Sequence, residues 1–157
     1  HSYIEVYEKI LAPYRENSTV MEIGINQGHS IKMWWEYFDN SEIFGVDIWE
    51  GAKDFIPKES LVNVIIADAT KPEFLKHIEG VGFDVVIDDG EHSHQSQVAT
   101  FNLLKGQMNK GALYVVEDVL NLDVIEPIFR SLHDNCEIID MRKTNNRFDN
   151  ILILFRF

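Results

Sequence analysis

The sequence predicts an α/β fold with a seven-stranded, mostly parallel sheet that ends in an antiparallel hairpin. Short apolar runs alternate with segments of helical periodicity, which is typical of a parallel sheet covered by helices. The last two apolar runs have no helical segment between them, which predicts the hairpin. The chain has 157 residues, of which 45% are hydrophobic and 25% charged, so it has enough apolar surface for a folded domain.

The elements follow in order along the chain. Helical periodicity begins at residue 3 and stops at Pro13. Buried strands, recognised by short apolar runs rich in Val and Ile, are predicted at residues 19–24, 43–47, 62–66, 83–88 and 111–116. Further helices are predicted at residues 29–38, 95–107 and 121–132. The final runs, 137–141 and 150–155, flank a turn-like segment at 143–147 and are predicted to pair as antiparallel strands.

The charge of the chain limits its partners. Lys and Arg number 14 against 26 Asp and Glu, so the formal net charge is −12. Phosphate backbones and anionic lipid surfaces repel such a surface, which disfavours nucleic acid and membranes as partners. No apolar run approaches the roughly 20 residues of a membrane helix. A neutral, cationic or metal-bridged ligand fits better.

Cysteine content and the chain start give the expected compartment and organisation. Cys136 is the single cysteine, so an internal disulfide is excluded. The start shows no signal peptide, and the cytoplasm is the expected location. We expect one domain over residues 1–157, which could be excised from a longer chain because the first residue is His.

Glycines follow the first predicted strand. Ligands of open α/β sheets bind beyond the carboxyl ends of the strands. Gly24 and Gly28 flank a tight turn into a helix, where backbone amides face a ligand. Their Gly-x-x-x-Gly spacing differs from the Gly-x-Gly-x-x-Gly pattern that holds a pyrophosphate, which disfavours NAD or FAD.

Acidic residues end the next two strands. Asp47 lies 19 residues after Gly28 (47 − 28), near the spacing of about 20 expected for a carboxylate that accepts both ribose hydroxyls. Ile48 beside it offers an apolar face to a purine. Asp68, next to the small Ala69, is suited to accept from an exocyclic amine. Each feature alone fits an ordinary turn or a solvated acid, but together they predict a nucleoside site.

Carboxylates gather after the fourth and fifth strands. Asp88-Asp89-Gly90-Glu91-His92 follows the fourth, and Glu117-Asp118 follows the fifth. We expect these strands to be neighbours, and crowded carboxylates need protons or a cation. Oxygen-rich ligation favours Mg2+ or Mn2+ over a structural zinc. The alternative interpretation is a solvated acidic rim on an already acidic protein.

Three stretches carry a family resemblance: VMEIGINQGHS, FDVVIDDGEHSHQSQVATFNLL and GALYVVEDV. They resemble the class I S-adenosylmethionine-dependent methyltransferases, whose fold is Rossmann-like. More narrowly, the chain from about Thr19 to its end is similar to the metal-dependent macrocin and mycinamicin type of sugar O-methyltransferase. That group is similar to proteins called cephalosporin hydroxylase and rhamnosyl O-methyltransferase. The resemblance implies S-adenosylmethionine as methyl donor and Mg2+ or Mn2+ as a second cofactor.

The resemblance also implies roles for single residues. The expected cofactor-binding residues are Glu22, Gly24, Gln27, Gly28, Ser30, Asp47, Ile48, Asp68, Ala69 and Asp88. The expected metal ligands are Asp89, Glu117 and Asp118, and His92 matches the general base. In one departure from the family, Ser96 rather than a histidine precedes Gln97, and His94 lies two residues earlier.

The expected reaction is methyl transfer to a sugar or glycan hydroxyl, rhamnose-type for instance, with the metal orienting vicinal oxygens and His92 taking the proton. From its length of 157 residues, we expect the chain to lack the extra domain and lid segments of the antibiotic enzymes. We therefore expect an open acceptor side, completed by a large glycan, a homo-oligomer or a fused domain. Three alternatives stay open: a catechol-like O-methyltransferase, a nucleotide-dependent oxidoreductase and a non-catalytic cofactor-binding module.

Overall fold

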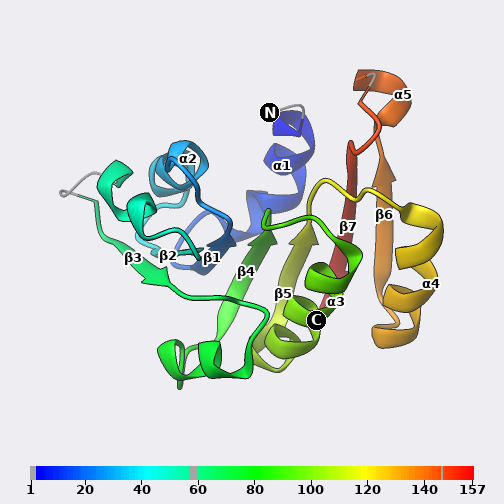
Figure 1. Ribbon diagram of the computed structural model, residues 1–157. Coiled ribbons are helices and arrows are strands. Elements are labelled where there is room, and N and C mark those ends of the chain that lie inside the picture. Colours follow the sequence, from blue (N-terminus) through cyan, green and yellow to red (C-terminus); the bar gives the residue numbers. More distant parts are fainter. Residues whose placement is uncertain (1–2, 57–59, 146) are drawn as a thin grey trace.

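A computed structural model describes residues 3–56, 60–145 and 147–157 and shows one sheet between two layers of helices (Figure 1). The strands are β1 Thr19–Ile23, β2 Glu42–Asp47, β3 Val62–Ile66, β4 Phe83–Asp88, β5 Met108–Val116, β6 Cys136–Asp140 and β7 Ile151–Arg156. The α-helices are α1 Ile4–Leu11, α2 His29–Tyr37, α3 His94–Leu104, α4 Leu122–Leu132 and α5 Arg142–Asn145. Short 3-10 helices are η1 Ala12–Tyr14, η2 Glu50–Phe55, η3 Pro72–His77 and η4 Lys105–Gln107.

The strand order is β3-β2-β1-β4-β5-β7-β6. Neighbouring strands from β3 to β5 pair in parallel, and β7 is antiparallel to both β5 and β6. The predicted seven-stranded, mostly parallel sheet with its C-terminal hairpin is thus confirmed. The chain moves outward from β1 to β3 and then returns to the other side of β1 as β4. The carboxyl ends of β1 and β4 therefore flank the point of reversal, where such sheets bind ligands.

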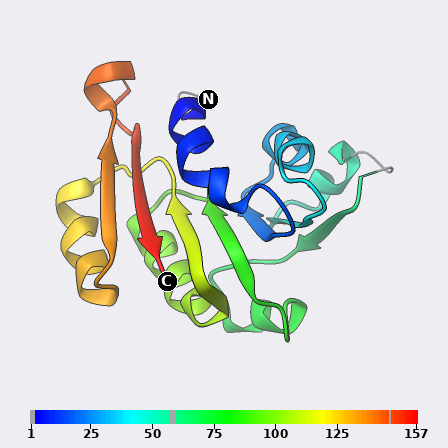
Figure 2. The same ribbon diagram turned by 180° about the vertical axis from the view of Figure 1, so that it is seen from behind.

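Helices cover both faces of the sheet. Figure 1 and Figure 2 show α3 and α4 on one face and α1 and α2 on the other. On the first face Phe101 of α3 packs against Phe155 of β7, with ring centroids 4.2 Å apart. On the second, Tyr7 of α1 meets Trp34 of α2 edge to face, with centroids 5.2 Å apart. The central strands are continuous apolar runs because both of their faces are buried.

The connection between β6 and β7 corrects one prediction. The segment 143–147 was expected to form a turn without helix, but α5 occupies Arg142–Asn145, and residue 146 lies outside the described part. The Asp140 carboxylate accepts from the backbone N–H of Arg142 at 3.1 Å and from its guanidinium at 2.7 Å, which stabilises the first turn. The predicted antiparallel pairing of the flanking strands is nevertheless present.

Strand β5 is longer than predicted, because it begins at Met108 rather than at residue 111. Its pairing with β4 shifts register between Phe83 and Val85, and Gly111 adopts a positive φ of 84° opposite this irregularity. A glycine inside a strand often marks such a bulge. In the sequence, Gly111 resembled the residue that begins the strand, so the predicted start was three residues too late. Within the described ranges, no helix combines the length and apolar character that crossing a membrane requires.

Candidate active site

The turn after β1 brings two loops into contact. Gly24 has a φ of +90°, and Gly28 has a φ of +71° at the N-cap of α2. A Cβ on Gly24 would lie 2.1 Å from the backbone carbonyl oxygen of Asp89. Only glycine therefore fits there, and its absence of a side chain lets the loop after β1 touch the loop after β4. The predicted glycine turn lies where a ligand can approach the backbone.

A cleft of about 970 Å³ opens at the carboxyl ends of the strands. We call it the strand-end cleft. The predicted cofactor residues that line it are Gly24, Gln27, Ser30, Asp47, Ile48, Asp68, Ala69 and Asp88. Gly28 and Glu22 are not among its lining residues. Gly28 caps α2, and Glu22 lines a second cavity of about 320 Å³ between α1 and α2.

Backbone contacts fix the two acidic residues of the nucleoside half. Asp47 accepts hydrogen bonds from the N–H groups of Asn26 and Trp49, both at 2.8 Å. Asp68 accepts from the Thr70 hydroxyl at 2.6 Å and from the Thr70 backbone at 2.9 Å, and these bonds lower the pKa of Asp68. The Ile48 side chain next to Asp47 is 74% exposed. The exposed apolar surface of Ile48 therefore lies next to the Asp47 carboxylate, whose orientation is fixed by backbone N–H groups.

Two buried carboxyl groups lie at the two cavities: Asp88 lines the strand-end cleft, and Glu22 lines the second cavity. Burial raises the pKa of Glu22 to about 8, although nearby Ser30 and Trp34 groups oppose the shift. Burial raises the pKa of Asp88 to about 7, opposed by the Gly90 backbone and the Tyr114 hydroxyl. Glu22 Oε2 has no hydrogen-bond partner among the described residues. Both groups therefore bind protons more readily than an exposed carboxyl group, and a positive charge nearby would favour their ionised forms.

Thermal stability of the ligand-free protein is expected to fall as the pH rises from 5 to 9. Folding raises the pKa of Glu22 from 4.5 to about 8 and that of Asp88 from 3.8 to about 7. Protonation therefore stabilises the fold fully below the unfolded pKa values, and this contribution is lost as the pH passes through 7 to 8. Differential scanning fluorimetry should show a Tm drop of at least about 5 °C.

Glu22→Gln should reduce this pH dependence because it removes one buried ionisation. Glu79→Gln is the matched control, since Glu79 lies exposed on the surface. A Tm that stays level or rises between pH 5 and 9 would contradict the burial of these carboxyl groups.

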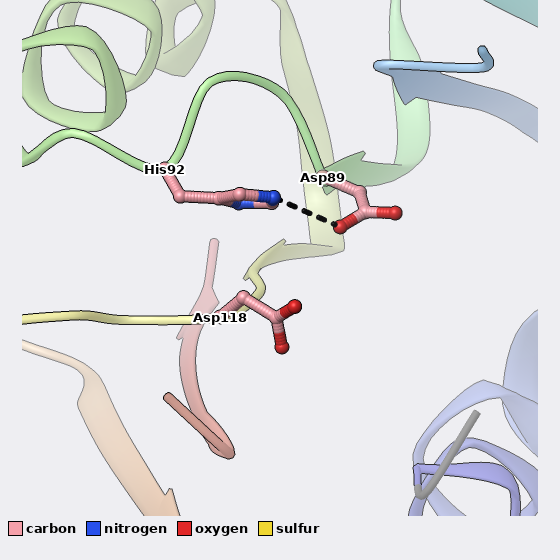
Figure 3. A group of neighbouring side chains, drawn as sticks. All are labelled: Asp89, His92 and Asp118. Carbon is pink, nitrogen blue, oxygen red and sulfur yellow. Dashed lines mark ion pairs between the residues drawn. The ribbon is translucent and has the colours of Figure 1, made fainter. Parts of the chain in front are cut away.

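Acidic side chains from β4 and β5 meet beside the strand-end cleft (Figure 3). Asp89 and His92 follow β4, Asp118 follows β5, and one ligand atom from each lies within 4.8 Å of the others. The His92 Nε2 atom is 3.9 Å from Asp89 Oδ1. Burial raises the pKa of Asp89 to about 6, and the charge of Asp118 adds to the rise while His92 opposes it. The arrangement can hold a cation.

Backbone strain accompanies this group. His92 has a φ of +63° and Asp118 a φ of +49°. Both lie in the left-handed region, which residues other than glycine rarely adopt. Such strain is concentrated at functional sites, where the surrounding structure maintains it. Here the two strained residues come from the loops after β4 and β5, and their side chains lie close together.

Glu117 lies beside this group of close ligand atoms but outside it. Its carboxylate is 4% exposed and accepts a hydrogen bond at Oε1 from the Tyr7 hydroxyl of α1. Oε2 has no partner in the described part of the chain. Burial, with the charge of Asp89 adding to it, holds the pKa of Glu117 well above its usual range. We use the term acidic cluster for Asp89, Glu117 and Asp118.

Three residues at the acidic cluster were not predicted as site residues. Tyr3 donates its hydroxyl to Asp118 Oδ1 at 2.5 Å, and Tyr7 donates to Glu117. Arg147, between β6 and β7, pairs with Asp118 Oδ2 at 3.3 Å. The spacing of Tyr3 and Tyr7 by four residues places both on one helix face, but that pattern is equally typical of an ordinary core helix. Nothing in the sequence marks Arg147.

Comparison with known proteins gives the family. The family described as "Methyltransferase domain" matches residues 21–119. This chain is a member of the methyltransferase-domain family. The match begins in β1 and ends just after the Glu117-Asp118 pair, so it includes the glycine turn and the acidic cluster.

Curated relatives of this methyltransferase domain are sugar O-methyltransferases. The 8-demethyl-8-alpha-L-rhamnosyl tetracenomycin-C 2'-O-methyltransferase of Streptomyces olivaceus is 36% identical over 129 residues, 76% of this chain and 33% of that protein. The mycinamicin VI 2''-O-methyltransferase of Micromonospora griseorubida is 33% identical over 129 residues, 76% of this chain and 32% of that protein. The predicted resemblance is confirmed. The chain spans about a third of the length of these relatives.

Solved structures confirm the Rossmann-like methyltransferase fold. The MycE methyltransferase of the mycinamycin biosynthetic pathway, in complex with Mg and S-adenosylhomocysteine, matches with a TM-score of 0.80 and 23% identity. The match covers 99% of this chain and 50% of that one. An S-adenosylmethionine-dependent methyltransferase from Archaeoglobus fulgidus matches with a TM-score of 0.68 and 18% identity, covering 99% of this chain and 94% of that one.

Proposed function

We propose that this domain transfers a methyl group from S-adenosylmethionine to a hydroxyl of a sugar or glycan, with Mg2+ or Mn2+ bound at the acidic cluster. The observation that carries the proposal is the grouping of Asp89, His92 and Asp118, of which Asp89 and His92 also line the strand-end cleft. Donor and acceptor would therefore meet at one point, and alignment of two reactants supplies much of an enzyme's acceleration.

The chemistry of the donor set fits a divalent cation. Asp89, Glu117 and Asp118 supply oxygen atoms, and burial leaves the pKa of both Asp89 and Glu117 raised. The Glu117 Oε2 atom has no other partner among the described residues. A cation would satisfy that oxygen and remove the repulsion among the carboxylates. We propose these three residues as the ligands and Mg2+ or Mn2+ as the ion.

The strand-end cleft fits S-adenosylmethionine. Gly24, Gln27 and Ser30, from the turn and the start of α2, are proposed to hold the methionine end above Glu22, with Gly28 shaping the turn. Asp47 is proposed to accept the ribose hydroxyls, and Asp68 the adenine amine. Ile48, Ala69 and Asp88 would line the remaining surface. In support, Asp47 is already oriented by two backbone N–H groups at the end of β2.

His92 is proposed as the general base. Its Nε2 atom lies 3.9 Å from Asp89 Oδ1, so the imidazole lies within reach of a hydroxyl held at the cluster. Its Nδ1 atom is buried without a partner in the described residues. The cation, when bound, would supply positive charge that lowers the pKa of the acceptor hydroxyl. The cofactor, when bound, supplies the electrophilic methyl group.

The named relatives support a sugar acceptor, because one is named for methylating an alpha-L-rhamnosyl tetracenomycin and another for methylating mycinamicin VI. Membership of the methyltransferase family disfavours a nucleotide-dependent oxidoreductase. A catechol-like acceptor and a non-catalytic module are distinguished by the assay below. The single-domain organisation, a homo-oligomer or fused domain, the cytoplasmic location and the exclusion of nucleic acid and membranes as partners stay predictions.

Methyl transfer from labelled S-adenosylmethionine should depend on added Mg2+ or Mn2+ and should fall to background in EDTA. The assay compares free sugars, rhamnose-containing glycans and a catechol, each with and without the divalent ion. We expect label on the sugar hydroxyl. Undiminished transfer in EDTA would contradict the metal role, and transfer to the catechol alone would favour the catechol-like alternative. Binding of cofactor and metal without any transfer would favour the non-catalytic module.

A further inference from the structure

We propose that α1 belongs to the metal site, and that Tyr3 and Tyr7 are positioning residues for the carboxylates of Asp118 and Glu117. The inference rests on the proposed function, because it assumes that these carboxylates bind a divalent cation. It concerns the N-terminal helix, which precedes the stretch that matches the family, residues 21–119.

Two tyrosines at the start of the chain contact the adjacent residues Glu117 and Asp118. The Tyr7 hydroxyl donates to Glu117 Oε1, and the Tyr3 hydroxyl donates to Asp118 Oδ1 at 2.5 Å. The two tyrosines lie one helical turn apart, and the two acidic residues are adjacent at the end of β5. Figure 2 shows α1 above the carboxyl ends of β4 and β5. Two successive carboxylates are thus held by the N-cap residue of α1 and by a residue of the helix itself.

The hydrogen bonds determine which oxygen atoms stay available. Tyr7 occupies one oxygen of Glu117 and leaves Oε2 buried without a partner in the described part of the chain. Tyr3 occupies Oδ1 of Asp118, while Oδ2 pairs with Arg147 at the surface. The Glu117 carboxylate, held at Oε1, therefore presents Oε2 as a ligand atom in a fixed direction. The Asp118 carboxylate is contacted at both oxygens, so a cation bound there would take the place of its exposed ion pair with Arg147. Such partners orient metal ligands in proteins.

Packing fixes the tyrosines themselves. Tyr3 is 1% and Tyr7 6% exposed, and their rings meet edge to face with centroids 6.3 Å apart. The Tyr7 ring also packs edge to face against Trp34 of α2. Because neighbouring rings restrict each phenol, its hydroxyl keeps one position relative to the cluster. The α1 helix thereby supplies rigid donors to groups whose mutual repulsion would otherwise spread them apart.

The test measures Mn2+ binding to the full chain by the electron paramagnetic resonance signal of free Mn2+. Tyr7→Phe and Tyr3→Phe keep the ring and remove the hydroxyl, so we expect each to weaken Mn2+ binding by about 10-fold. The affinity for S-adenosylhomocysteine should stay unchanged. Tyr14→Phe is the matched control, because the Tyr14 hydroxyl donates to the Gly111 carbonyl at 2.7 Å instead of to a carboxylate of the cluster.

A double-substitution cycle separates positioning from general stability. In a Glu117→Ala background, Tyr7→Phe should cause no further loss of Mn2+ affinity, since its partner is absent. Unchanged Mn2+ affinity in both Tyr7→Phe and Tyr3→Phe, with a wild-type protein that binds Mn2+, would overturn the inference alone. A wild-type protein that binds S-adenosylhomocysteine but no Mn2+ would overturn the metal half of the proposed function. If Tyr7→Phe fails to fold, Tyr3→Phe decides the question.

Discussion

Asp89→Ala is expected to reduce metal-dependent methyl transfer to background while leaving the affinity for S-adenosylhomocysteine nearly unchanged. Asp89 belongs to the group formed with His92 and Asp118, in which one ligand atom from each lies within 4.8 Å of the others. Its side chain is the carboxylate that links the cluster to the strand-end cleft. Its backbone carbonyl, which meets Gly24, is retained in the variant. The measurement pairs a labelled methyl-transfer assay with calorimetric titration of the cofactor product.

Glu117→Ala should behave in the same way, because it removes the buried oxygen that is proposed as a ligand. Glu79→Ala serves as the control for the loss of one negative charge at an exposed site away from the cluster. Full metal-dependent turnover in Asp89→Ala would contradict the assignment of this carboxylate to the cation. Loss of cofactor affinity together with turnover would point instead to a role in the strand-end cleft.

Replacing His92 is expected to lower kcat by about 10²–10⁴-fold, the typical contribution of a positioned acid–base group, with Mn2+ binding retained. His92 has a φ of +63°, which Ala adopts at a cost. His92→Asn is therefore the better variant, because Asn tolerates the left-handed region. Steady-state kinetics and Mn2+ titration on the same preparation provide the measurement.

A kcat close to that of the wild type would contradict the base role of His92. A different outcome, in which His92→Asn loses Mn2+ affinity, would make the imidazole a ligand. The structure itself raises this distinction, because the group of close ligand atoms includes His92 and leaves out Glu117.

The sequence predicted the sheet because its strands are buried on both faces. The predicted bounds of β3 and β4 agree with the structure, since each apolar run stops at a polar or small residue. The same reasoning places Asp47 and Asp68 at successive strand ends. The carboxyl ends of parallel strands share one edge, so residues distant in sequence were predicted to line one cleft.

The contacts of α1 with the acidic cluster were beyond prediction from sequence patterns. Tyr7 lies 110 residues before Glu117, and tyrosines at helical spacing are typical of core packing. Glu117 lies outside the group of close ligand atoms formed by Asp89, His92 and Asp118, and its carboxylate accepts a hydrogen bond from Tyr7 instead. Arg147 reaches Asp118 from a connection that carries no motif. Side-chain direction at the site thus depends on long-range partners that local periodicity does not specify.

Nuclear magnetic resonance of bound S-adenosylmethionine with substoichiometric Mn2+ tests the adjacency of the two cofactors most directly. Paramagnetic broadening depends steeply on distance. We expect strong broadening of the sulfonium methyl signal in the wild type, weaker broadening of the adenine protons, and loss of both effects in Asp89→Ala. Equal broadening of the methyl and adenine signals, or broadening that persists in Asp89→Ala, would contradict a cation seated beside the methyl donor.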